Sequence, residues 1–136
     1  MLDSILCVDD DPITLMLCKM VIRKADFANE IITAENGELA LHFFDDLKLN
    51  NLGSEIKKYP HLIFLDLNMP VMGGWEFLEI FSKQEYISTF KDCKVIVLSS
   101  TIDPQDIQKA KTYPMVLDFL SKPITKEMLE DLKNIF

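Results

Sequence analysis

Residues 61–70 read HLIFLDLNMP. Within this stretch, a short run of large apolar residues, 62–65, is followed directly by an aspartate, Asp66. A run of this length, bounded by polar residues, is typical of a strand that is buried on both faces of a parallel sheet. Asp66 stands at the end of this strand, and Met69-Pro70 and Gly73-Gly74 mark the loop that follows it. An unpartnered carboxylate beside a core strand is costly, so Asp66 indicates a functional site rather than a structural one.

Apolar runs and helical patterns alternate on both sides of this stretch. The apolar runs predict strands at residues 5–8, 31–34, 61–65, 94–98 and 116–120. The helix starts are expected at Asp11-Pro12, Asn36-Gly37, Gly73-Gly74, Asp103-Pro104 and Thr125. This alternation predicts an α/β fold of the doubly wound (βα)5 type, with a parallel sheet covered on both sides and one domain over residues 1–136.

Two segments do not follow the simple pattern. Residues 13–25 are strongly apolar, with Lys19 and Arg23 four residues apart as the expected solvent-facing stripe of a helix. The polar segment 48–59 predicts a helix end followed by an extended loop.

The composition of the chain reduces the range of functions to be considered. The net charge of −8 opposes contact with phosphate backbones, so we expect no direct nucleic-acid binding. Cys7, Cys18 and Cys93 form no CxxC pair, which argues against a disulfide framework or zinc site and favours a reducing compartment. There is no signal-peptide pattern and no apolar run long enough for membrane insertion, so we expect a cytoplasmic protein.

The ends of the predicted strands carry the reactive groups. The first strand ends in Asp9-Asp10-Asp11 and the third in Asp66, while Ser99-Ser100 follows the fourth and Lys122-Pro123 the fifth. The carboxyl ends of parallel strands share one edge of a sheet, where ligands bind. Carboxylates gathered there repel one another unless a cation neutralises them, and an all-oxygen set favours Mg²⁺. A metal, a lysine and hydroxyl donors beside a nucleophilic carboxylate are the parts needed for phosphoryl transfer.

These residues resemble the signature of response-regulator receiver domains, the CheY-like family of two-component signalling. The resemblance rests on 8–12 (VDDDP), 65–70 (LDLNMP) with Gly73-Gly74, 98–100 (LSS) and Lys122-Pro123, in the right order along nearly the whole chain. Four separate matches are far more specific than any one of them. The resemblance implies a flavodoxin-like sheet with strand order 2-1-3-4-5.

The resemblance also implies the site roles. Asp66 corresponds to the phosphoacceptor and a metal ligand. Asp10 corresponds to a direct Mg²⁺ ligand, Asp9 to one acting largely through water, and Asn68 to a ligand through its backbone carbonyl. Mg²⁺ is thus the expected cofactor.

The remaining roles concern transfer and switching. Lys122 is expected to pair with the phosphoryl oxygens, through a cis Lys122-Pro123 bond, and Ser99 is expected to supply the switch hydroxyl. Phe119 takes the place of the switch aromatic but lacks the hydroxyl of a tyrosine. The 113–115 segment (YPM) departs from the usual Gly-Ala before the fifth strand, which puts the geometry of that corner in doubt.

Several residues have simpler explanations. Asp11 is expected to cap a helix, Gly73-Gly74 to serve backbone geometry, and His42 and His61 to be structural. Thr101, two residues past the switch serine, is not acidic, and this position would help to set the rate of phosphoryl loss.

The predicted function is a phosphorylation switch rather than a turnover enzyme. A sensor histidine kinase or histidine phosphotransfer protein would donate to Asp66. The surface of the fourth helix, fifth strand and fifth helix would then change its preference for a downstream protein or a phosphorylation-dependent dimer. Two alternatives stay open: a phosphatase of the haloacid-dehalogenase type, and an interaction module that works without phosphorylation. The first normally places its nucleophile after the first strand in a DxD arrangement, unlike Asp66.

Overall fold

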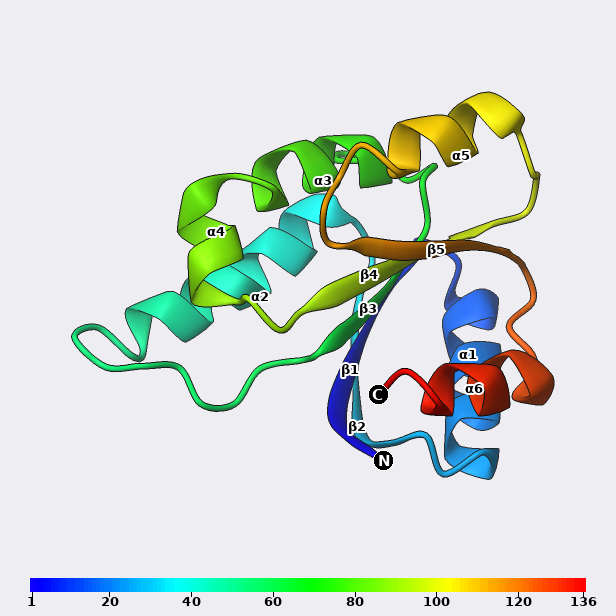
Figure 1. Cartoon of the computed structure of the whole chain (residues 1–136), viewed down its shortest axis with the longest axis horizontal. Helices are drawn as coiled ribbons and strands as arrows, with labels where there is room; N and C mark the ends of the chain where they lie inside the picture. The colour runs from blue at the N-terminus through cyan, green and yellow to red at the C-terminus, as the bar shows by residue number, and fades with distance from the viewer.

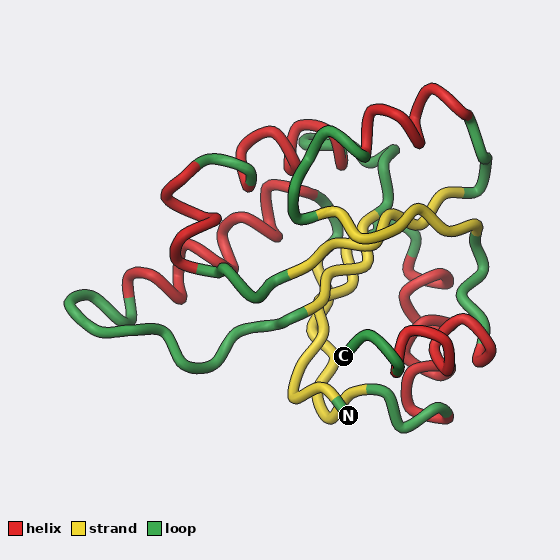
Figure 2. The backbone as a smooth tube through the Cα atoms, viewed as in Figure 1, coloured by secondary structure: helices red, strands yellow, loops and turns green.

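Five parallel strands form one sheet in the order β2-β1-β3-β4-β5, as the resemblance predicts (Figures 1 and 2). The structure is a computed structural model that describes residues 1–136. The strands are β1 Leu2–Val8, β2 Ala28–Ala34, β3 Leu62–Leu65, β4 Lys94–Ser99 and β5 Val116–Ser121. Helices cover both faces of the sheet, which confirms the predicted α/β class.

The chain forms six helices, one more than the sequence predicts. They are α1 Pro12–Lys24, α2 Gly37–Leu49, α3 Gly74–Phe81, α4 Gln84–Thr89, α5 Pro104–Ala110 and α6 Lys126–Lys133. The additional helix, α4, is short and polar, with Tyr86 as its only buried residue, so it lacks the repeating apolar face by which helices are recognised. The helices predicted as fourth and fifth are therefore α5 and α6.

Side-chain caps start four helices where the sequence predicts them. The Asp11 carboxylate accepts a hydrogen bond from the backbone N–H of Ile13 at 2.9 Å, which confirms its role as a cap. Asn36, Asp103 and Thr125 cap α2, α5 and α6 in the same way. Each cap satisfies a backbone donor that the first helical turn leaves free.

Two strands begin three residues earlier than predicted. In the observed pairing of β1 with β2, Leu2 lies opposite Ala28 and Ser4 opposite Glu30. The polar residues in these starts conceal them from a search for apolar runs, because backbone pairing holds them in the sheet.

The sheet separates two apolar cores. On one face, α2 and α3 pack phenylalanines, including Phe44, Phe77 and Phe81, against β1, β3 and β4, and α4 adds Tyr86. On the other face, α1 and α6 contribute residues such as Ile22 and Leu129. This packing fixes the strand ends, and with them the residues that follow each strand.

The segment between α2 and β3 is an anchored loop. Helix α2 ends at Leu49 and β3 begins at Leu62, so the segment holds the predicted helix end followed by a loop, which spans residues 50–61. Ile56 is buried in the core, and the Tyr59 ring packs edge-on against Phe90 with centroids 5.3 Å apart. The loop precedes β3, so it lies at the sheet edge opposite Asp66.

None of the helices combines the length and apolarity that crossing a bilayer requires.

Candidate functional site

Three carboxylates meet at the carboxyl ends of two neighbouring strands. Asp9 and Asp10 follow β1, and Asp66 follows β3; each offers an oxygen within 4.8 Å of the others. The backbone N–H of Asp66 donates to the carbonyl of Val8 at 3.0 Å, which holds the two strand ends together. Asp9 and Asp66 are buried, whereas Asp10 is exposed. We call Asp9, Asp10 and Asp66 the acidic cluster.

Lys122 is the cation of this cluster. Its ammonium nitrogen lies 2.6 Å from Oδ2 of Asp9 and 3.2 Å from Oδ1 of Asp66. The backbone N–H of Lys122 donates to the carbonyl of Ser99 at 2.8 Å, and the Lys122-Pro123 peptide bond is cis, as the resemblance implies. The lysine therefore reaches the acidic cluster from β5, across β4 and β3.

The pKa values of Asp66 and Lys122 are both raised in the folded protein. Burial raises the pKa of Asp66, the charge of Asp9 raises it further, and Lys122 offsets only part of this rise. Burial lowers the pKa of Lys122, but the carboxylates of Asp9 and Asp66 outweigh this effect and raise it overall. The lysine thus stays charged, while a proton competes for Asp66 at higher pH than for an ordinary aspartate.

Ser99 lies at the end of β4 with its hydroxyl turned toward its own loop. The hydroxyl donates to the backbone carbonyl of Thr101 at 2.6 Å and accepts from the Thr101 N–H at 3.2 Å. Asn68 is exposed two residues beyond Asp66, and Phe119 is half-buried on β5 opposite Val97. The structure thus brings Lys122 onto the acidic cluster and leaves the Ser99 hydroxyl engaged elsewhere.

Gly74, the first residue of α3, lies directly against the strand end that carries Asp66. A Cβ atom at this position would come within 2.5 Å of the Asp66 carbonyl oxygen and 2.9 Å of the Leu67 Cα. No side chain fits there without moving the backbone, which confirms the geometric role expected of this glycine. In the preceding loop, Val71 adopts a positive φ of 69°, a conformation that β-branched residues rarely take.

A surface feature beside the site escapes the sequence prediction. Ile13, Met16, Leu17 and Met20 form an apolar stripe on α1, and each is between 43% and 63% exposed. The opposite face of α1 buries Leu15, Cys18 and Ile22 in the core, so the helix is apolar on two sides. The i, i+3, i+4, i+7 spacing of the stripe is visible in the sequence, but spacing alone does not tell which apolar face meets the core. Leu17 and Lys122 line the same small hollow, so the α1 stripe adjoins the site.

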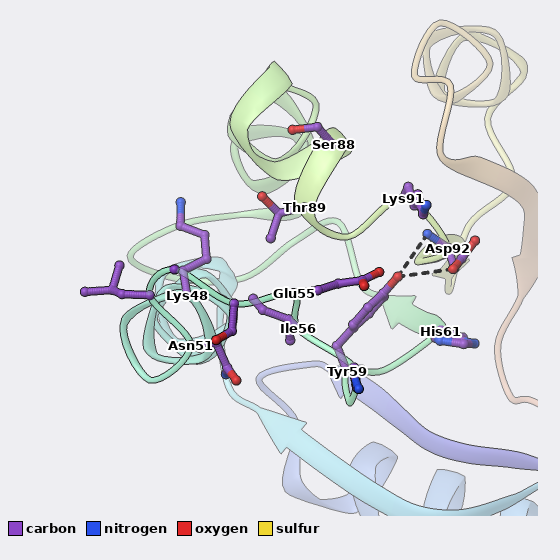
Figure 3. A pocket seen from close by; sticks show the side chains of 14 residues that line it. Lys48, Asn51, Glu55, Ile56, Tyr59, His61, Ser88, Thr89, Lys91 and Asp92 are labelled. Atoms are coloured by element: carbon purple, nitrogen blue, oxygen red, sulfur yellow. Dashed lines mark hydrogen bonds between the residues drawn. The ribbon is translucent and has the colours of Figure 1, made fainter.

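A larger pocket lies at the other edge of the sheet, away from the acidic cluster. It has a volume of about 690 Å³ between the 50–61 loop and the end of α4, and most of its lining is polar (Figure 3). The Tyr59 hydroxyl lies beside Asp92, where it donates to the carboxylate and accepts from the backbone N–H, both at 3.3 Å. This hydrogen bonding ties the loop to the segment just before β4.

Comparison with solved structures places the chain among known regulators. A two-component response regulator from Cytophaga hutchinsonii is similar over 98% of this chain and 96% of its own, with a TM-score of 0.86 and 33% identity. The chemotaxis protein CheY4 of Vibrio cholerae covers 100% of both chains with a TM-score of 0.76 and 26% identity.

Similar sequences also come from proteins of two-component signalling. The two-component response regulator ARR17 of Arabidopsis thaliana is 31% identical over 95% of this chain and 81% of its own length. The chain spans only 10% of the hybrid signal transduction histidine kinase C of Dictyostelium discoideum and 19% of ARR12 of Arabidopsis thaliana, which it also matches.

Residues 5–133 match the response regulator receiver domain, which covers the acidic cluster, Ser99, Phe119 and Lys122. Receiver domains are signalling modules rather than enzymes, and an acidic triad such as Asp9, Asp10 and Asp66 is typical of their magnesium site. The order of the strands, the position of the acids at their carboxyl ends and the match over nearly the whole length agree with one another. The chain belongs to the response regulator receiver domain family of two-component signalling systems.

Proposed function

We propose that Asp66 accepts a phosphoryl group from a phosphohistidine on a sensor histidine kinase or a histidine phosphotransfer protein. One observation carries the proposal: three carboxylates lie within 4.8 Å of one another, and a lysine bridges two of them. Asp9, Asp10, Asp66 and the backbone carbonyl of Asn68 would hold Mg²⁺. The all-oxygen character of this set fits a hard divalent cation.

The chemistry follows from the acid and the base. An oxygen of ionised Asp66 forms a bond to phosphorus, and the bond from phosphorus to the donor imidazole nitrogen breaks. The electron pair of that bond stays on the nitrogen, which takes a proton from solvent. Lys122, held at 3.2 Å from Asp66, balances charge on the transferring oxygens. Mg²⁺, when bound, would neutralise the remaining negative charge on the oxygens of the transferring phosphoryl group.

The signal leaves the site through Ser99. The hydroxyl of Ser99 releases the Thr101 carbonyl and turns to a phosphoryl oxygen, which draws the loop before α5 inward. Phe119 follows into the space this opens, and the surface formed by α5, β5 and α6 changes its affinity for a downstream protein.

The surroundings of the site support a protein donor. An in-line transfer brings the donor's imidazole to Asp66, so the donor surface covers the residues around it. Leu17 of the α1 stripe shares a small hollow with Lys122, and the stripe offers apolar area of the kind that protein interfaces bury. The family and three unpaired cysteines support work in a reducing cytoplasm.

The direct test is mass spectrometry after treatment with acetyl phosphate and Mg²⁺. Wild-type protein should gain the mass of one phosphoryl group, and the Asp66→Asn variant should gain none. The Asp10→Asn variant should gain it only slowly, because the metal loses a ligand. An equal gain in Asp66→Asn would place the phosphoryl group elsewhere and contradict the proposal.

The two alternatives fit less well. A phosphatase of the haloacid-dehalogenase type carries its nucleophile after the first strand, whereas Asp66 follows β3. Sustained turnover of p-nitrophenyl phosphate by the wild-type protein would favour that alternative. A module that works without phosphorylation has no use for the acidic cluster, and failure to bind Mg²⁺ in calorimetry would favour it.

A further inference from the structure

Helix α5 is loosely held by its own packing. It has seven residues, and Ala110 is the only one that is buried. The residues that lead into it from Ser99, 100–103, are all exposed. The position of α5 therefore depends on side-chain contacts outside the apolar core.

Trp75 of α3 supplies one of these contacts. The ammonium nitrogen of Lys109, on α5, lies 4.5 Å from the centroid of the Trp75 ring, a distance typical of a cation–π interaction. The ring of Tyr113, just beyond α5, stacks on Trp75 with centroids 6.3 Å apart and 27° between the planes. Trp75 thus contacts one side chain of α5 and one from just beyond its end.

Glu79, one turn farther along α3, makes the second contact. The Tyr113 hydroxyl donates to Oε2 of Glu79 at 3.0 Å. Burial raises the pKa of Tyr113, and the nearby Glu79 carboxylate raises it further, so the hydroxyl keeps its proton. Trp75 and Glu79, four residues apart on α3, thus contact Lys109 on α5 and Tyr113 just beyond it. Helices α3 and α5 lie in one layer (Figure 1). We call Trp75, Glu79, Lys109 and Tyr113 the clasp.

The clasp joins two helices that are anchored at different parts of the phosphorylation site. The backbone N–H of Gly74 donates to the carbonyl of Leu67 at 2.9 Å, which fastens the start of α3 to the segment that follows β3 and carries Asp66. Helix α5 instead follows the loop whose Thr101 carbonyl holds the Ser99 hydroxyl at 2.6 Å. We therefore expect a movement of the Ser99 loop toward Asp66 to shift α5 relative to α3, and the clasp spans the boundary between these two helices.

We propose that the clasp is a latch that holds α5 in its resting position and opens when Asp66 is phosphorylated. This inference rests on the function proposed above and adds a device that sets how readily the switch turns. Contacts made in only one of two states favour that state, so a weaker clasp makes activation easier.

The test compares a weakened clasp with a matched control. The double variant Lys109→Gln/Tyr113→Phe removes the cation and the hydroxyl while keeping Trp75. Lys111→Gln is the control, because it removes the same charge from an exposed lysine of the same segment that makes no ion pair, side-chain hydrogen bond or cation–π contact. Beryllofluoride with Mg²⁺ mimics the phosphoryl group, and fluorine NMR counts how much is bound.

The double variant should bind beryllofluoride roughly threefold to tenfold more tightly than wild type, from the usual strength of such contacts. Each single variant should account for part of this gain, and Lys111→Gln should behave as wild type. Trp75, the only tryptophan of the chain, provides a second readout in the wild-type protein. Acrylamide should quench its fluorescence more strongly once beryllofluoride is bound.

Two results would overturn the latch while leaving phosphorylation intact. In one, the double variant binds beryllofluoride no more tightly than Lys111→Gln. In the other, Trp75 quenching stays the same in protein that fluorine NMR shows to be loaded. A wild-type protein that binds no beryllofluoride and gains no mass from acetyl phosphate would instead defeat the proposed function, and the latch with it.

Discussion

Lys122 donates to Oδ2 of Asp9 at 2.6 Å, a contact between residues 113 positions apart in the chain and shorter than its contact with Asp66. The lysine of the site is thus held most closely by Asp9, the acid that directly follows β1. Before any metal arrives, this contact offsets part of the repulsion between the buried carboxylates.

Removing Lys122 should expose that repulsion. In metal-free buffer, Lys122→Ala should lower the free energy of unfolding by about 1–3 kcal/mol, because two buried acids lose their counter-charge. Millimolar Mg²⁺ should restore most of this loss. Urea denaturation with and without the metal checks this, with the exposed Lys126→Ala as control. A loss that Mg²⁺ leaves unchanged would assign Lys122 a role in packing alone.

Neutralising Asp66 should stabilise the metal-free protein. Burial and the charge of Asp9 raise the pKa of Asp66, so its ionised form is unfavourable in the folded state at neutral pH. Asp66→Asn removes that charge and should raise the Tm by roughly 2–6 °C, equivalent to about 1 kcal/mol. The exposed Asp46→Asn should leave the Tm nearly unchanged in calorimetry. A lower Tm for Asp66→Asn would mean that its pairing with Lys122 outweighs burial.

The same raised pKa predicts how pH affects metal binding. The folded protein keeps the Asp66 proton to higher pH than the unfolded chain does. In metal-free buffer, the stability that Asp66 contributes is therefore full below its unfolded pKa and is lost as the pH rises through the folded pKa. Mg²⁺ binds only the ionised carboxylate, so the stabilisation it adds should grow over this window. Thermal melts with and without Mg²⁺, from about pH 4 to about pH 8, measure this added stabilisation at each pH. Its growth with pH should vanish in Asp66→Asn.

Val71 offers a test of backbone strain beside the site. It is 75% exposed and has a φ of 69°, so its side chain gains little from burial and suffers the clash of the left-handed region. Val71→Gly should stabilise the protein by about 1 kcal/mol in urea denaturation. Asp26→Gly, at a φ of 49°, should gain less, since aspartate tolerates this region better. Destabilisation by Val71→Gly would show that the valine side chain makes contacts worth more than its strain.

The α1 stripe should matter for a protein donor and not for a small one. Ile13→Lys and Leu17→Lys place charge on apolar surface beside the site, and each should slow transfer from a histidine phosphotransfer protein by about tenfold or more. Acetyl phosphate should still phosphorylate both variants at the wild-type rate. Ile135→Lys, at a similarly exposed residue near the C-terminus, serves as control. Equal rates from the protein donor in all three variants would exclude the stripe from the interface.

The sequence predicts the sheet and the acidic cluster because both depend on local signals. Residues 62–65 are apolar without interruption, and Asp66 follows at once, so strand and site are recognised together. The starts of β1 and β2 and the short helix α4 escape detection because backbone pairing and tertiary packing hold polar residues there.

Contacts between distant segments account for the rest. No local pattern tells that the Ser99 hydroxyl turns to Thr101, or that Trp75 contacts Lys109 and Tyr113. The exposed face of α1 is missed for a related reason: a helix with two apolar sides offers two candidate inner faces, and only the fold selects one.

The 50–61 loop offers a practical handle on this switch. Gly53, at φ 76°, has open space where a Cβ would stand, while Ile56 and Tyr59 fasten the chain behind it. A dye, an affinity tag or a second protein inserted at Gly53 would lie in the loop that precedes β3, whereas Asp66 follows that strand. Such a fusion would let the regulator be immobilised or imaged while both its chemistry and its output helices stay accessible.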